Sequence, residues 1–141
     1  MSSIATERLV LKPTAVEDAA FILELLNSPK WLEFIGDRNV KSIAEAEAYI
    51  KERMLPQFER LGFTNNVVIR KADGKKIGAC GLYDRDGLEG IDIGFAFLPG
   101  FEGQGYGYES ASALLQTAFK DYKLNRVIAI TSKHNMPSQN L

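Results

Sequence analysis

The sequence predicts an α/β protein in which helices pack against a mixed β-sheet. Short runs of apolar and β-branched residues have the length and alternation of strands, while longer segments repeat their apolar residues every three or four positions, as one face of a helix does. In order, the segments are a strand, two helices, three strands, a helix and a strand. Because the chain has 141 residues, 45% of them hydrophobic, we expect a single domain spanning residues 1–141.

The first strand and the first helix lie near the N-terminus. Residues 8–12 alternate polar and apolar side chains, as a half-buried strand does, and Pro13 ends the run. Thr14 and Glu17 then have the spacing of a capping box, which predicts the start of a helix. The apolar face of that helix consists of Phe21, Ile22, Leu25 and Leu26.

The second helix is predicted by the same signals. Ser42 and Glu45 form another candidate capping box. The apolar stripe that follows contains Ala46, Tyr49, Ile50 and Met54. Pro56 interrupts this stripe, and we expect the helix to bend there because proline has no N–H for the carbonyl four residues back.

The middle of the chain predicts an antiparallel meander. Residues 63–70 and 77–83 are apolar, partly β-branched runs, and an Asp-Gly pair at 73–74 lies between them as a hairpin turn. A second Asp-Gly pair at 86–87 precedes a third strand at residues 91–98.

A helix and a final strand complete the predicted elements. The apolar positions at helical spacing define one buried face, and they are Ala111, Leu114, Leu115, Ala118, Phe119 and Tyr122. Residues 127–131 follow as a strand. The order of all these elements is what predicts a mixed sheet with helices packed on it.

The clearest candidate site is a glycine-rich loop between a strand and a helix. Gly103, Gly105 and Gly107 alternate there with Gln104 and Tyr106. A helix N-terminus exposes unpaired N–H groups and carries partial positive charge, so we expect this loop to bind phosphate oxygens through its main chain. The alternative is a turn in which the glycines only permit positive φ angles. Valine at Gly105 or Gly107 is expected to block the ligand and to leave the fold largely intact.

Two common phosphate-binding patterns do not fit this loop. A Walker loop would end in Gly-Lys-Ser or Gly-Lys-Thr, and that tripeptide does not follow these glycines. A Rossmann fingerprint needs GxGxxG and an acidic residue at the end of the next strand, whereas residues 130–132 read Ile-Thr-Ser. We therefore expect a different phosphate ligand.

The composition argues against several other classes of protein. The 17 basic and 18 acidic residues give a net charge of −1 without a long run of either sign, so no nucleic-acid binding is expected. Because the N-terminus lacks the apolar core of a signal peptide and no apolar run approaches membrane-spanning length, we expect a cytoplasmic protein without membrane contact. The lone Cys80 is expected to be buried, and the lone His134 has no partners at metal-ligand spacing, so no metal is predicted.

Three segments together resemble the GNAT acetyltransferases. Residues 91–99 and 101–109 are similar to the family's coenzyme A-binding motif, Gln/Arg-x-x-Gly-x-Gly/Ala. Residues 6–11 and 135–138 resemble the subgroup that includes ribosomal-protein N-terminal acetyltransferases. The resemblance implies the GNAT fold, with a mostly antiparallel central sheet flanked by helices. It also implies an enzyme that moves an acetyl group from acetyl-coenzyme A to the primary amine of a protein N-terminus or a small molecule.

The resemblance further implies which residues bind the co-substrate. The backbone of Phe95, Ala96 and Phe97 would bond the pantetheine arm and the acetyl carbonyl, and Asn135 would contact the pantetheine where two strands splay apart. The residues implied to receive the pyrophosphate are Gly103, Gln104, Gly105, Tyr106, Gly107 and Tyr108. Glu102 stands where the family has Gln or Arg, so binding is expected to rely on main-chain donors.

The implied reaction is direct attack of an amine on the thioester, which needs donors for the oxyanion and a proton for the departing thiolate. Many family members use a tyrosine to supply that proton, but its position would fall just beyond residue 141. The nearest hydroxyl in this sequence is that of Ser138. The alternative role of Ser138 is to cap a helix. Ile130 stands where some N-terminal acetyltransferases have a glutamate base. Asp92 and Glu33 are candidates for activating an amine through water, but their expected place is a solvated strand face or loop.

The C-terminus predicts a helix that has only begun, because Pro137 and Ser138 form a start signal and no stop signal follows. Family members continue with that helix and two further strands, so we expect a truncated part of a longer protein. The alternative is that another chain supplies these elements. A homodimer is a separate candidate for the oligomeric state. Two other functions stay open: a GNAT-like sensor that binds acyl-coenzyme A without turnover, and an unrelated α/β protein that binds a phosphate ligand.

Overall fold

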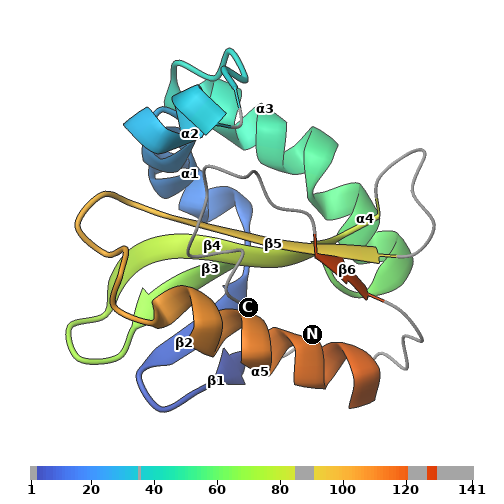
Figure 1. Cartoon of the computed structure of the whole chain (residues 1–141). Coiled ribbons are helices and arrows are strands. Elements are labelled where there is room, and N and C mark those ends of the chain that lie inside the picture. Colours follow the sequence, from blue (N-terminus) through green and yellow to red (C-terminus); the bar gives the residue numbers. More distant parts are fainter. Residues whose placement is uncertain (1–2, 35, 85–90, 121–126, 130–141) are drawn as a thin grey trace.

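A single mixed sheet organises the computed structural model, which describes residues 3–34, 36–84, 91–120 and 127–129 (Figure 1). Its strands lie in chain order and are β1 (Ile4–Ala5), β2 (Leu9–Pro13), β3 (Asn65–Arg70), β4 (Lys75–Tyr83), β5 (Ile91–Phe97) and β6 (Val127–Ala129). Neighbours from β1 to β5 are antiparallel, whereas β6 pairs with β5 in parallel. The predicted α/β class with a mixed, mostly antiparallel sheet is confirmed.

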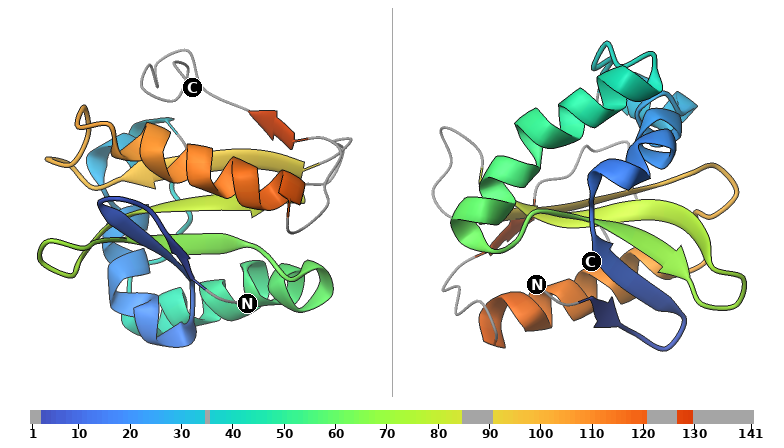
Figure 2. Two further views of the ribbon diagram at one scale, coloured as in Figure 1. Left: turned by 90° about the horizontal axis from the view of Figure 1, so that it is seen from below. Right: turned by 180° about the vertical axis from the view of Figure 1, so that it is seen from behind.

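Helices cover both faces of this sheet, as Figures 1 and 2 show. One layer comprises η1 (Val16–Asp18), α1 (Ala19–Leu26), α2 (Pro29–Phe34), α3 (Ile43–Arg53) and α4 (Leu55–Leu61). The opposite layer is α5 (Tyr106–Lys120). Because successive side chains of a strand point to opposite faces, the fully buried Val67 packs with the α1 and α3 cluster while Val68 packs with the α5 cluster. The sheet therefore has a hydrophobic core on each side.

The start of the first helix differs from the predicted capping box. Thr14 and Glu17 do not form one; the side-chain carboxylate of Asp18 instead accepts the N–H of Ala15 at 2.9 Å. The Thr14 hydroxyl accepts a bond from the Asn65 side-chain amide at 2.9 Å. Asp18 takes the capping role because two lysine side chains from the sheet also bind it, so tertiary contacts outweigh the local pattern.

The second helix follows its prediction. The Glu45 N–H donates to the Ser42 hydroxyl at 3.1 Å, which confirms the cap, and the Glu45 carboxylate accepts the N–H of Lys41 at 2.9 Å. The helix breaks at Met54, so that α3 and α4 are separate, and Pro56 lies in the first turn of α4. The predicted effect of Pro56 is confirmed, because the break spares the helix a missing N–H in its interior.

The meander is confirmed as far as the structure describes it. The 73–74 turn joins β3 to β4, with Gly74 at a φ of 70° and the Asp73 carboxylate accepting the N–H of Lys75 at 3.2 Å. The 86–87 turn lies outside the described residues. In α5, Ala111, Leu114 and Ala118 are buried as predicted, whereas Phe119 is 51% exposed. Phe119 follows Ala118 by one position, about 100° around the helix, and so leaves the buried face.

Candidate functional site

The glycine-rich loop connects β5 to α5 and passes beyond the end of the sheet (Figure 1). Its backbone requires glycine at three places, because Gly100, Gly103 and Gly105 have φ angles of 93°, 73° and 83°. The first i to i−4 bond of α5 runs from the Glu109 N–H to the Gly105 carbonyl at 3.0 Å. The N–H groups of the preceding turn therefore lack acceptors within the helix, as a main-chain anion site needs.

The loop glycines have different surroundings. A Cβ at Gly103 would have no atom within 4 Å, whereas a Cβ at Gly105 would lie 3.3 Å from Nη2 of Arg8. At Gly107 it would lie 2.4 Å from Cε1 of Phe95, on β5. The expectation that valine at Gly107 leaves the fold largely intact is therefore wrong. Gly107 is small because the first turn of α5 packs directly on the Phe95 ring.

The N-terminal segment also contacts the loop, through Arg8. The Arg8 Nη1 donates to the Gln104 carbonyl at 3.1 Å, and its Nε donates to the Glu109 carboxylate at 2.7 Å. The Arg8 guanidinium also lies over the Tyr106 ring, 4.5 Å from its centroid. The Glu109 carboxylate additionally accepts the Arg8 N–H at 2.9 Å and the Thr6 hydroxyl at 2.5 Å.

These bonds determine the charge state of Glu109. Burial alone would raise the pKa of Glu109, because only 18% of its side chain is exposed. The hydrogen bonds from Thr6 and from the Arg8 backbone and side chain outweigh burial and lower the pKa below its ordinary value. Glu109 is therefore ionised at neutral pH, in the first turn of α5, where negative charge is favourable.

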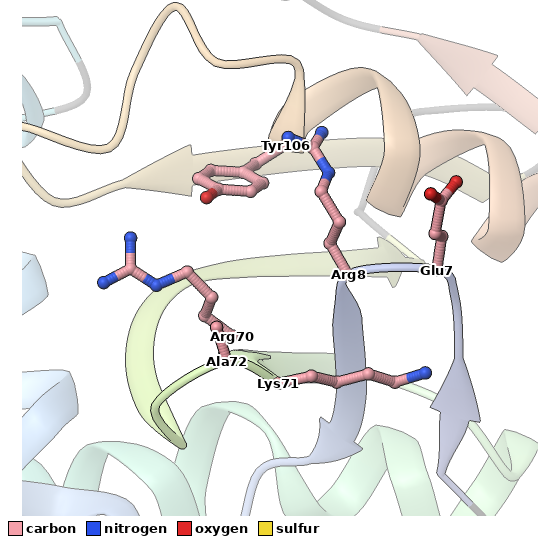
Figure 3. A pocket seen from close by; sticks show the side chains of 6 residues that line it. All are labelled: Glu7, Arg8, Arg70, Lys71, Ala72 and Tyr106. Atoms are coloured by element: carbon pink, nitrogen blue, oxygen red, sulfur yellow. The ribbon is translucent and has the colours of Figure 1, made fainter.

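A cleft of about 350 Å³ lies beside the start of α5 and is lined by Glu7, Arg8, Arg70, Lys71, Ala72 and Tyr106 (Figure 3). In Figure 3, the guanidinium of Arg8 lies next to the Tyr106 ring, whereas Lys71 points away from it. The cations that line the cleft already have partners. Arg70 binds the Asp73 carboxylate at 2.6 Å and Lys71 donates to the Thr6 carbonyl at 2.5 Å.

Sequence reasoning did not identify this basic lining. Arg8 lies in the 6–11 segment, whose likeness to a subgroup was noted, but no pattern along the chain indicated what it contacts. Arg70 and Lys71 end the third strand and begin a turn, where basic residues are ordinary. A polar residue at the start of the predicted half-buried strand is ordinary, so Arg8 gave no signal of its own either.

On β5, the predicted pantetheine segment follows the residues whose pairing with β6 the structure describes. The β6 register pairs Val127–Ala129 with Ile91, Asp92 and Ile93, and Phe95 to Phe97 follow. On their other side, Phe95, Ala96 and Phe97 pair with Cys80, Ala79 and Gly78 of β4. The pantetheine role of Phe95 to Phe97 stays a prediction, because the chain that follows β6 lies outside the described residues.

The remaining sequence-predicted residues lie in several places. Asn135, Ser138, His134 and Ile130 are outside the described residues. Asp92 is 2% exposed, so the expectation of a solvated strand face is wrong. Glu33 is exposed on α2, as expected.

Cys80 is buried in the core, and burial raises its pKa to about 12, although a bond with Ser110 acts in the opposite direction. Its thiol is thus protonated at neutral pH and is not a nucleophile. Within the described segments, no group of three or more His, Cys, Asp or Glu side chains is arranged to hold a metal ion. No helix in that same part of the chain combines the length and apolar character needed to cross a bilayer.

Comparisons with known proteins place this geometry in a family. An uncharacterized N-acetyltransferase, YnaD, from Bacillus subtilis (strain 168) is 27% identical over 135 residues, which are 96% of this chain and 76% of that protein. The structure of a GNAT-family acetyltransferase from Bacillus anthracis has a TM-score of 0.78 and 25% identity, covering 99% of this chain and 79% of the other.

A third similar protein is RimL, a ribosomal L7/L12 alpha-N-protein acetyltransferase whose structure holds coenzyme A. It has a TM-score of 0.79 at 18% identity, covering 99% of this chain and 80% of the other, so it shows the fold alone. The family profile described as the acetyltransferase (GNAT) domain matches residues 8–141. With that match over nearly its whole length, this chain belongs to the GNAT acetyltransferase family.

Proposed function

We propose that this protein transfers an acetyl group from acetyl-coenzyme A to a primary amine. The observation that carries the proposal is the glycine loop, which leads from the β5 backbone directly into the N-terminus of α5. The first-turn N–H groups and the helix dipole favour a pyrophosphate at residues 103–108. A structural relative with the same fold holds coenzyme A, which supports coenzyme A as the ligand.

The β5 backbone supplies the second part of the site. Residues Phe95, Ala96 and Phe97 lie beyond the β6 pairing that the structure describes. We assign their main-chain groups to the pantetheine arm and to the developing oxyanion, since backbone N–H donors aimed at a carbonyl oxygen stabilise a tetrahedral intermediate. Asn135, from the resemblance, is assigned to the same arm.

The proposed reaction balances without a covalent enzyme intermediate. The amine lone pair attacks the thioester carbon, the C–N bond forms and the carbonyl becomes an oxyanion. When that intermediate collapses, the C–S bond breaks, the sulfur takes a proton and the nitrogen loses one. We assign the proton on sulfur to Ser138, whose hydroxyl is restored by the proton that the nitrogen loses. Cys80 takes no part, because its buried thiol stays protonated.

The proposed acceptor is the amine of a protein N-terminus or of a small molecule. The 6–11 and 135–138 motifs support the protein N-terminus, because they resemble the subgroup that includes ribosomal-protein N-terminal acetyltransferases. RimL, which has the same fold, is described as a ribosomal L7/L12 alpha-N-protein acetyltransferase. An assay panel should therefore begin with peptides that carry ribosomal-protein N-termini, and continue with polyamines, amino acids and aminoglycosides.

Two measurements on the chain test the proposal. Calorimetric titration with acetyl-coenzyme A reports binding, and release of free coenzyme A thiol in the presence of each amine reports turnover. Binding together with amine-dependent thiol release is the expected result. Binding without release from any amine would favour the acyl-coenzyme A sensor, and absence of binding would overturn both.

A further inference from the structure

The contacts of Arg8 converge on the glycine loop and on the first turn of α5. Its side chain reaches the Gln104 carbonyl, the Tyr106 ring and the Glu109 carboxylate, although Arg8 precedes them by about a hundred residues, 101 in the case of Glu109. Arg8 immediately precedes β2, which is paired along its whole length with β3. The loop is therefore bonded to a residue anchored in the sheet.

The bond to Gln104 determines how the loop presents its N–H groups. The Gln104 carbonyl and the Gly105 N–H belong to one planar trans peptide, so they point in opposite directions. Because Arg8 Nη1 holds the carbonyl at 3.1 Å, the Gly105 N–H points away from Arg8. Gly105 has a φ of 83°, which is one of several conformations open to a glycine in the free chain.

Two of the three guanidinium nitrogens of Arg8 bond to the loop and to the first turn of α5. Its Nε is engaged by Glu109 and its Nη1 by Gln104. Glu109 is in turn held by the Thr6 hydroxyl and the Arg8 N–H, so both members of the pair have other fixed partners. An Arg–carboxylate pair with this many additional bonds is oriented more firmly than an isolated surface pair.

We infer that Arg8 is a positioning residue for the co-substrate: it orients the glycine loop so that the Gly105 peptide is ready to bind the pyrophosphate of coenzyme A. This inference rests on the proposed function, because it presupposes that the loop binds coenzyme A. Glu109 supports Arg8 by fixing its guanidinium. The inference gives Arg8, in the N-terminal 6–11 segment, a role at a loop residue 96 positions away.

The test compares two ligands in three variants. Arg8→Gln removes the charge and the forked donor, and Arg8→Lys keeps the charge but not the fork. Arg60→Gln is the matched control, because Arg60 also binds a carboxylate, Asp84, at 3.0 Å, and it lies on α4, in the helix layer across the sheet from α5. Coenzyme A and pantetheine, which lacks the pyrophosphate, are each titrated against every protein. Where a ligand binds too weakly for direct titration, its affinity is measured by competition with the other ligand.

We expect Arg8→Gln to weaken coenzyme A binding by about tenfold while pantetheine binding changes less than about twofold. Arg8→Lys should recover only part of that loss, and Arg60→Gln should bind both ligands as the unaltered protein does. A purely structural role would lower the affinity for both ligands together, so the ratio of the two affinities is the diagnostic quantity.

The outcomes separate the inference from the proposed function. If the unaltered protein does not bind coenzyme A, the proposed function fails and the inference fails with it. If it binds but Arg8→Gln binds equally well, or loses both ligands in proportion, the inference alone is overturned. Should Arg8→Gln not fold, the affinity ratio of Arg8→Lys decides, and an unchanged ratio there also overturns it.

Discussion

Gly103 and Gly62 have nearly the same backbone conformation in different places. Gly103 lies in the glycine loop with a φ of 73°, and Gly62 ends α4 with a φ of 85°. A Cβ at either position would meet no atom within 4 Å. Alanine should therefore cause the same backbone strain at both, about 1–2 kcal/mol, without a clash. The two glycines are a matched pair for separating ligand contact from folding.

Gly103→Ala should weaken acetyl-coenzyme A binding by about tenfold, because its Cβ would occupy the space from which phosphate oxygens approach the main chain. Gly62→Ala should bind normally, and both variants should lose similar free energies of unfolding in urea. Calorimetric titration provides the comparison. Equal affinities for the two variants would remove Gly103 from the site.

Ser138 is assigned by resemblance, and its role stays a prediction because it lies outside the described residues. Ser138→Ala should lower kcat for acetyl transfer by at least about tenfold, since a positioned acid typically contributes more than that. The dissociation constant of acetyl-coenzyme A should not change. Ser132→Ala serves as the control, and an unaltered kcat in Ser138→Ala would leave only a helix-capping role.

At the scale of elements, Asp18 joins the first helix to the sheet. Its side chain is 0% exposed and binds Lys12 of β2 at 2.9 Å and Lys76 of β4 at 2.7 Å. Burial by itself would raise the pKa of Asp18, but the bonds from Lys76, the Ala15 N–H and Lys12 outweigh it and lower the pKa below 3.8. One carboxylate thus fixes where α1 meets two strands.

Asp18→Asn should lower the free energy of unfolding at pH 7 by about 1–3 kcal/mol, because two ammonium groups lose a buried partner. Since the pKa is depressed in the folded state, the stabilisation is present above the unfolded value of 3.8 and is lost as the pH falls through the folded value. Urea unfolding at a series of pH values measures the difference in free energy of unfolding between Asp18→Asn and the unaltered protein.

The matched control for this experiment is Asp84→Asn. The ion pair between Asp84 and Arg60 is exposed, so its loss should lower the free energy of unfolding by less than about 1 kcal/mol. The difference between Asp18→Asn and the unaltered protein should shrink below about pH 4. A difference that stays constant down to pH 2 would show that the carboxylate charge does not carry the stabilisation.

At the scale of the whole molecule, one sheet supports two cores. Val67 and Val68 are adjacent and both 0% exposed, yet they pack with helices on opposite faces. If both layers fold with the sheet as one unit, the site loop between β5 and α5 shares that stability. A valine-to-alanine change on either face should then weaken the same transition.

Val67→Ala and Val68→Ala should each lower the free energy of unfolding by about 2 kcal/mol, from lost burial and the cavity that remains. Each variant should keep a single transition by calorimetry, with coincident far-UV and near-UV signals. Saturating acetyl-coenzyme A should raise the midpoint of all three proteins alike. A second transition in either variant would contradict the single domain expected from the sequence.

Local patterns along the chain predict most of the helices and strands and the glycine loop between β5 and α5, because these depend on residues a few positions apart. The two-residue alternation of residues 8–12, the Ser42 cap and the break near Pro56 involve partners within a few positions, and each is confirmed. The glycines of residues 103–107 indicated the strand-to-helix loop for the same reason, since a positive φ is a local property.

The residues that support that loop could be identified only from the folded structure, because they come from distant parts of the chain. Arg8 and Glu109 meet although they are 101 positions apart, and the small size of Gly107 is required by the Phe95 ring on a neighbouring strand. Asp18 displaced the predicted Thr14 cap because two strands brought lysines to it. Such contacts depend on how the sheet and helices pack, and no periodicity along the chain encodes them.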